Sequence, residues 1–329
     1  METELTKPGT AEPGESRKKI FSIVGRVIVS AVVLSLVFSL VQWENALIAF
    51  KSADSRFILL AALLLSVNIG IRTLKWRSML QTVKDHPTLR EAFGSVMLGI
   101  SLGSFTPGEL GEFAGRALHV TDAKRSHLVG LTLLDKAQMF IVTSCAGVVS
   151  LLFLTFDNSF LLVITAMVII LLSSIVIVRL DVIAILGHRL NYSLFNKPWL
   201  TRVLEGLSFL NFRQLISTVL YTGMYHGILI LQMYFLINGF SKIDMIHAFI
   251  GTSAMMFVKS LLPISIGDLG IREAGSIYFF SIYDISQAAA LNASLILFFI
   301  NIFIPSILGT YFIRHQHLSA LNLAQFWKK

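Results

Sequence analysis

The sequence predicts an all-α polytopic membrane protein made of two inverted-topology repeats, each with a re-entrant or broken helical hairpin. Of its 329 residues, 55% are hydrophobic and only 14% are charged, whereas about a quarter of a soluble domain is charged. Several apolar runs approach the roughly 20 residues that cross a bilayer. The same pattern also interrupts the apolar sequence twice: a proline, then Gly-acid-Leu-Gly, then an arginine.

The net charge of +8 is best explained by basic cytoplasmic loops, so we expect no nucleic-acid partner. Cys145 is the one cysteine, and it lies in an apolar run, which excludes a disulfide framework and a multi-cysteine metal site. The apolar runs do not alternate with polar residues as the strands of a membrane barrel do. The composition therefore indicates a helical membrane protein without a metal centre.

The first half begins with a polar, basic stretch at residues 1–20, which predicts a disordered cytoplasmic tail. Membrane repeat 1 covers residues 21–156, and its predicted spans are 21–43, 57–76 and 128–153. The second span ends in Arg72, Lys75 and Trp76, residue types that mark a cytoplasmic interface. Residues 92–105 are apolar but too few to cross, so we expect a re-entrant segment there.

The second half, residues 157–315, is predicted to be membrane repeat 2, with spans at 160–178, 215–240 and 288–312. It contains a mixed basic stretch at 179–213, which we interpret as cytoplasmic amphipathic helices. A second re-entrant segment is expected at 245–262, with a short apolar return at 277–283. Residues 316–329 form a predicted cytoplasmic tail, and the distribution of Lys and Arg places both termini in the cytoplasm.

The two breaks occupy corresponding positions of the halves, which are predicted to have opposite orientations. The residues expected to break the helices are Pro107, Gly108, Gly111, Pro263, Gly267 and Gly270. Proline removes a backbone donor and glycine frees the chain to turn. Irregular backbone at membrane depth is tolerated only against protein or a water-filled cavity, and inverted repeats of transporters place their substrate sites at such breaks. We therefore expect both tips to meet in one charged chamber.

Ionisable residues near the breaks are the substrate-binding candidates, because charges inside a membrane are costly and usually functional. They are Glu109, Glu112, Arg116, Asp135, Lys136, Lys259, Asp268, Arg272 and Glu273. Helix N-termini restarting after each proline also attract anions, so Arg116 and Arg272 are predicted to hold a phosphate. The acids would receive a cationic headgroup or balance the arginines. The alternative is that acids and arginines only pair with each other and fix the breaks.

Three pairs of these positions allow narrower expectations. Glu112 and Arg116 stand four residues apart with the acid first, the favourable order for a helical pair, and Asp268 and Arg272 have the same spacing. Asp135 and Lys136 are adjacent, so they point to different helix faces; one could pair across to a break, or both could lie at the interface.

Two motifs of soluble enzymes are missing from the sequence. It contains no Gly-x-x-x-x-Gly-Lys phosphate loop and no His-Glu-x-x-His. We therefore predict that the protein is not an enzyme, has no catalytic residues and uses no cofactor. Any transport would be passive or driven by a gradient.

The breaks resemble those of the lysylphosphatidylglycerol synthase transmembrane-region family, also described as flippase-like. The first motif is Thr106-Pro107-Gly108-Glu109-Leu110-Gly111-Glu112, and the second runs from Leu262-Pro263 to Arg272-Glu273. The end of the second span, Arg72-x-x-Lys75-Trp76, is similar to the family's Arg-x-x-Arg-Trp, while Asp135-Lys136 stands where the family often has Glu-Arg.

This resemblance implies a lipid translocase in a bacterial or archaeal plasma membrane, because better-known members move aminoacylated phosphatidylglycerol between leaflets. Those members add a soluble aminoacyl-transferase domain, and we expect a stand-alone member without it. The expected partners are membrane lipids, phospholipid-type or polyprenyl-linked, together with a lipid-modifying enzyme or further copies of the chain. Two rival functions are an enzyme acting on a polyprenyl-phosphate-linked lipid and a non-transporting scaffold for a lipid-modifying enzyme.

Overall fold

The computed structural model describes residues 43–104, 106–155, 209–262 and 268–314, with a few isolated positions between 156 and 208. These residues form helices and no strand. Four helical segments are long and apolar enough to cross a membrane: α3 (Ser55–Leu80), α6 (Arg125–Thr155), α10 (Phe212–Asn238) and the segment Gln287–Phe312. The predicted all-helical polytopic class is confirmed.

Several predicted segments lie outside the described residues. They are the tails at 1–20 and 316–329, the spans at 21–43 (except Trp43) and 160–178, most of the insert at 179–213, and Pro263 to Gly267 in the second break. Trp43 instead opens a further helix, α2 (Trp43–Lys51), and the end of the insert belongs to α10. The division into two inverted repeats stays a prediction.

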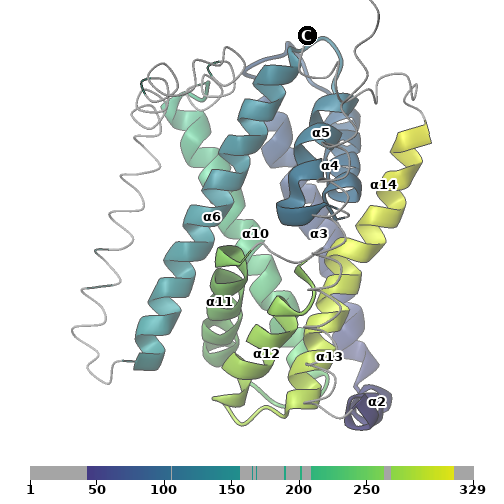
Figure 1. Cartoon of the computed structure of the whole chain (residues 1–329), viewed down its shortest axis with the longest axis vertical. Coiled ribbons are helices and arrows are strands. Elements are labelled where there is room, and N and C mark those ends of the chain that lie inside the picture. The colour runs from purple at the N-terminus through teal and green to yellow at the C-terminus, as the bar shows by residue number, and fades with distance from the viewer. Residues whose placement is uncertain are drawn as a thin grey trace, which may run out of the picture.

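The first break lies at the tip of a helical hairpin. Its arms are α4 (Leu89–Ser104) and α5 (Leu110–His119), joined by η1 (Pro107–Glu109). At about 1.5 Å per residue, α4 is about 24 Å long, short of the about 30 Å hydrocarbon core. Glycines bring the arms together: a Cβ on Gly115 would lie 2.6 Å from the carbonyl oxygen of Leu98. Figure 1 shows both arms at one end of the bundle.

A second hairpin, α11 (Met245–Leu261) and α12 (Ile271–Ser281), enters from the other end of the bundle (Figure 1). Asp244 caps α11 by accepting hydrogen bonds from the backbone N–H groups of Ile246 and His247. The predicted return at 277–283 began too late, since α12 already includes Arg272 and Glu273, both buried. Protein neighbours rather than lipid surround these charges, which is why the helix can start with them.

The last span is divided between the two hairpins. It consists of α13 (Gln287–Phe298), a π-helical turn η5 (Phe299–Phe303) and α14 (Ile304–Arg314). Pro305 has no N–H for the carbonyl group four residues earlier, and the wider turn lies beside it. Ser276 of α12 donates to the carbonyl of Ala290 in α13 at 2.8 Å. A Cβ on Gly309 of α14 would lie 2.3 Å from the carbonyl oxygen of Met97 in α4.

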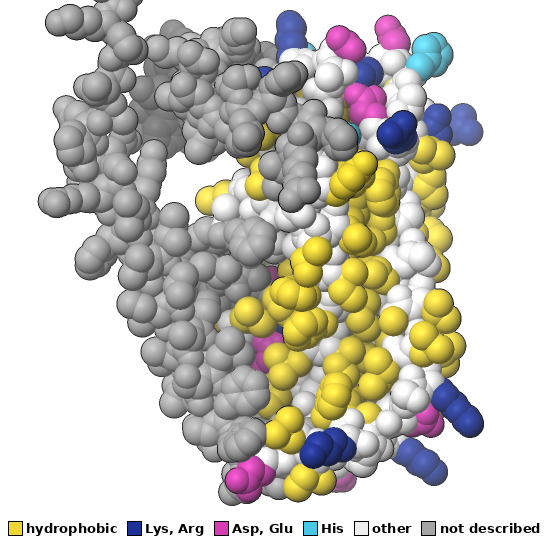
Figure 2. Space-filling view, turned by 90° about the vertical axis from the view of Figure 1, so that its right-hand side faces the viewer, with side chains coloured by type: hydrophobic (Ala, Val, Ile, Leu, Met, Phe, Trp, Pro, Cys, Tyr) yellow, Lys and Arg dark blue, Asp and Glu magenta, His cyan; other side chains and the backbone are white. Residues whose placement is uncertain are grey.

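Apolar side chains cover the middle of the face seen in Figure 2, and charged side chains gather at its two ends. This distribution matches a bilayer belt with polar borders. Inside the molecule, one apolar cluster surrounds Trp76 and Met79 near the first hairpin, and another surrounds Met233 and Phe280 near the second.

Candidate functional site

The acid of each Gly-acid-Leu-Gly motif has the same unusual backbone conformation. Glu109 has φ 56° and Asp268 has φ 58°, in the left-handed region that non-glycine residues seldom adopt. Gly108 and Gly270, at φ 57° and 92°, also have positive φ. Such strain concentrates at functional sites. Both acids are held at hairpin tips by backbone that costs free energy to form.

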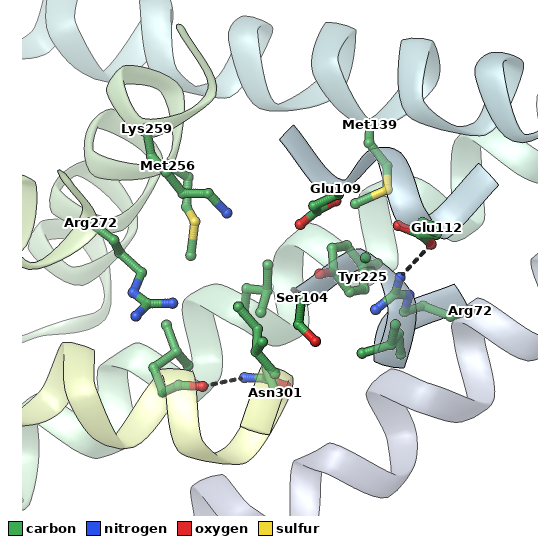
Figure 3. A pocket seen from close by; sticks show the side chains of 15 residues that line it. Arg72, Ser104, Glu109, Glu112, Met139, Tyr225, Met256, Lys259, Arg272 and Asn301 are labelled. Carbon is green, nitrogen blue, oxygen red and sulfur yellow. Dashed lines mark hydrogen bonds and ion pairs between the residues drawn. The ribbon is translucent and has the colours of Figure 1, made fainter. Parts of the chain in front are cut away.

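Two adjoining cavities, of about 80 and 310 Å³, lie where the tips meet. Glu109, Tyr225 and Lys259 line both. The smaller also has Arg72, Ser104, Glu112, Arg272 and Asn301 in its wall, and the larger has Lys136, His226 and Asp268. Glu109 and Asp268 therefore reach one chamber, as expected. Figure 3 shows Lys259 and Arg272 pointing into it from one hairpin and Glu109 facing them from the other.

Glu112 is the centre of the ion-pair network in the first wall. Its Oε1 accepts from Arg72 Nη2 at 3.0 Å and from Arg116 Nη2 at 2.5 Å. Its other oxygen pairs with Lys136, which also pairs with Glu109. Glu112 is 2% exposed, so the three bases must replace the water that would otherwise stabilise the charge of its carboxylate.

Arg116 lies behind this wall rather than in it, and lines neither of the two cavities. Its Nη1 is 2.8 Å from Asp135, and its guanidinium lies 4.6 Å from the ring centre of Trp76. The predicted i, i+4 pair with Glu112 is confirmed. The structure thus gives Arg116 a place that orients Glu112, away from the space where a phosphate would fit.

Lys75 and Trp76 of α3 are buried and Arg72 lines the smaller cavity, which corrects the sequence interpretation of these residues as an interface. Lys75 Nζ lies 2.5 Å from Asp135 and donates to Thr222 at 2.6 Å. Trp76 is 1% exposed. Basic residues at the end of an apolar run look alike in sequence whether they meet lipid headgroups or a buried carboxylate.

The adjacent residues Asp135 and Lys136 of α6 point in different directions, as expected of neighbours in a helix. Asp135 pairs with Lys75 and Arg116, while Lys136 pairs with Glu109 and Glu112. Asp135 is buried, so the alternative of an interfacial pair is wrong. Each of the two neighbours connects α6 to the first hairpin, one behind the chamber wall and one inside it.

The second wall contains two separate ion pairs. Lys259 Nζ lies 2.8 Å from Asp268, and Arg272 Nη2 lies 2.6 Å from Glu273. Glu273 also accepts from the backbone N–H of Gly270 at 2.6 Å, and Arg272 Nε lies 3.2 Å from Ser294 of α13. The expected pair between Asp268 and Arg272 is wrong, because the backbone between them is not helical.

A chain of amides that was not predicted from the sequence reaches the smaller cavity at Asn301, which we call the chamber floor. Asn301 of η5 donates to Gln232 at 2.9 Å and accepts from Asn68 at 3.2 Å, and Gln232 donates to the carbonyl of Ala61 at 3.0 Å. Arg72, Ser104 and Tyr225 also line the smaller cavity and were not predicted as site residues. Polar amides inside apolar spans were the available signal, since buried polar groups need partners there. His226 bonds to Ser253 at 3.3 Å.

The fold and chamber define an all-helical, multi-pass membrane protein with paired hairpin tips at a buried ionic site. A family model described as the lysylphosphatidylglycerol synthase TM region matches residues 23–309. The chain belongs to this family. It is also similar to the UPF0104 membrane protein PH1989 of Pyrococcus horikoshii, with 22% identity over 317 residues, covering 84% of this chain and 92% of that protein. These findings suggest a role related to membrane lipids.

Proposed function

We propose that the protein moves a phospholipid-type headgroup across the membrane through the chamber between the hairpin tips, without catalysing a reaction. The observation that carries this proposal is a charged chamber inside an apolar bundle, lined from both hairpins. A polar headgroup in hydrocarbon is costly. The chamber offers it ionic and hydrogen-bonding partners, while acyl chains stay in the bilayer.

Among the wall residues, Lys259 and Arg272 suit a phosphate best. Both face the cavity from the same hairpin (Figure 3), and each is paired with a single acid. Charge-assisted hydrogen bonds to phosphate are roughly twice as strong as neutral ones. Across the chamber, Glu109 has 39% of its side chain exposed and is available to a hydroxyl or ammonium group of the same headgroup. Arg116 acts as a positioning residue for Glu112.

The test is leaflet exchange in proteoliposomes that contain a tail-labelled fluorescent phospholipid, read by quenching with a membrane-impermeant reductant. The paired variant Lys259→Met/Arg272→Met should lose at least about 90% of the exchange rate, because a buried phosphate would lose both cations. Lys84→Met is the matched control, since Lys84 belongs to an ion pair with Glu91 outside the chamber. Exchange that survives in the chamber variant contradicts the proposal, and product formation without exchange indicates an enzyme.

A further inference from the structure

The charged side chains of the chamber do not balance. In the first wall and directly behind it, four bases meet three acids: Arg72, Lys75, Arg116 and Lys136 against Glu109, Glu112 and Asp135. In the second wall, the two bases Lys259 and Arg272 meet the two acids Asp268 and Glu273. Among the described residues, the whole cluster therefore carries one positive charge in excess.

The residues that face the cavities give the same result. The four bases there are Arg72, Lys136, Lys259 and Arg272, and the three acids are Glu109, Glu112 and Asp268. His226 also lines the larger cavity and bonds to Ser253 at 3.3 Å, and we count it as neutral. Two ways of counting, over the network and over the lining, agree on a surplus of one.

We infer that the chamber selects a headgroup with a net charge of −1, namely a monoanionic phosphodiester lipid, over zwitterionic and cationic lipids. This inference rests on the proposed function. In a site of low dielectric constant, an uncompensated charge is costly, so the complex of lowest free energy is the neutral one. A zwitterionic headgroup, which also carries an ammonium, would leave the complex with a charge of +1. An aminoacylated headgroup with a net charge of +1 would raise the charge of the complex to +2.

The ion pair between Lys259 and Asp268 supplies a matched pair of variants. Lys259→Gln and Asp268→Asn each break the same 2.8 Å contact. The first lowers the chamber charge by one, from +1 to 0, and the second raises it to +2. A purely structural role of the pair predicts the same loss from both, whereas charge selection predicts opposite changes in lipid preference.

The experiment measures exchange of three lipids with the same labelled tail in one set of proteoliposomes: a phosphatidylglycerol (−1), a phosphatidylcholine (0) and a lysyl ester of phosphatidylglycerol (+1). In the unaltered protein, the first should exceed the second by a factor on the order of ten, within the range of coupling between close charges. Lys259→Gln should bring the zwitterionic lipid to the level of the anionic one or above it, and Asp268→Asn should widen the original difference.

Equal rates for all three lipids, or preference for the cationic one, overturn the charge inference while translocation stands. Parallel shifts in the two variants also overturn it. Movement of none of the lipids by the unaltered protein overturns the proposed function and the inference with it. The ranking of the three lipids by exchange rate is measured in the unaltered protein. The inference can therefore be refuted even if a variant fails to fold.

Discussion

Replacing Glu112 by glutamine tests the ion-pair network of the first wall. The side chain keeps its shape but loses the charge that three bases share: Arg72 at 3.0 Å, Arg116 at 2.5 Å, and Lys136. Arg116 is 2% exposed, so water cannot take over as its partner. Removing one member of a buried ion pair costs about 3–5 kcal/mol, and we expect Glu112→Gln to lower the free energy of unfolding by at least that amount.

The measurement is reversible unfolding in mixed micelles, with Glu91→Gln as control. Glu91 pairs with Lys84, and after its loss Lys84 keeps the carbonyl of Thr121 at 2.9 Å and Asp122 at 3.8 Å, so the control should cost clearly less than Glu112→Gln. Adding Arg72→Gln to Glu112→Gln returns the wall to one excess positive charge. The double variant should therefore lose less than the sum of the single losses. A cost for Glu112→Gln equal to that of the control, or strictly additive losses, would refute the reasoning.

Three further predictions concern packing, the chamber floor and pH. Gly115→Ala should destabilise by about 1–3 kcal/mol because its Cβ meets backbone atoms of α4, whereas Gly223→Ala, with open space around it, should not; equal effects would contradict the close approach. Asn301→Leu should lower the free energy of unfolding by about 1–3 kcal/mol, since Gln232 and Asn68 lose their partner. An unchanged free energy of unfolding would show that the amide chain does not stabilise the fold. Asp244 lies outside the spans, and the backbone N–H of His247 holds the pKa of its carboxyl below the usual value. The stability that the ionised Asp244 cap gives to α11 is therefore present above the unfolded pKa, about 3.9, and is lost as pH falls through the folded pKa. Amide protection at the start of α11, corrected for the intrinsic pH dependence of exchange, should fall on that descent and should fall much less in Asp244→Asn.

The existence of the two breaks could be predicted because their cause is local. Proline, glycines and an apolar run too short to cross act within about a dozen residues, and the structure has a hairpin at each place. The pair of Glu112 and Arg116 could be predicted for the same reason, since it lies within one regular helix. The spacing rule failed for Asp268 and Arg272 because positive φ angles at Asp268 and Gly270 interrupt the helical geometry that the rule assumes.

The direction in which each charge faces could not be predicted from the sequence. Periodicity places Glu112 and Arg116 on one face of α5, but the packing of α5 on α4 decides that Glu112 meets the cavity and Arg116 meets Trp76. Arg72 contacts an acid 40 residues away, a relation that no local pattern contains. The amide chain through Asn301 likewise depends on three spans meeting at one depth.

The π-helical turn Phe299–Phe303 has a mechanical consequence. The segment before it is fastened to the second hairpin through Ser276 and Arg272, and the segment after it is fastened to the first through Gly309 and the 2.7 Å contact between Ser104 and Ser306. Any rocking of one hairpin against the other must then be absorbed at this π-helical turn, where Pro305 already lacks the N–H for one helical hydrogen bond. The same turn holds Asn301 at the chamber floor, so bending the hinge and reshaping the floor are one movement.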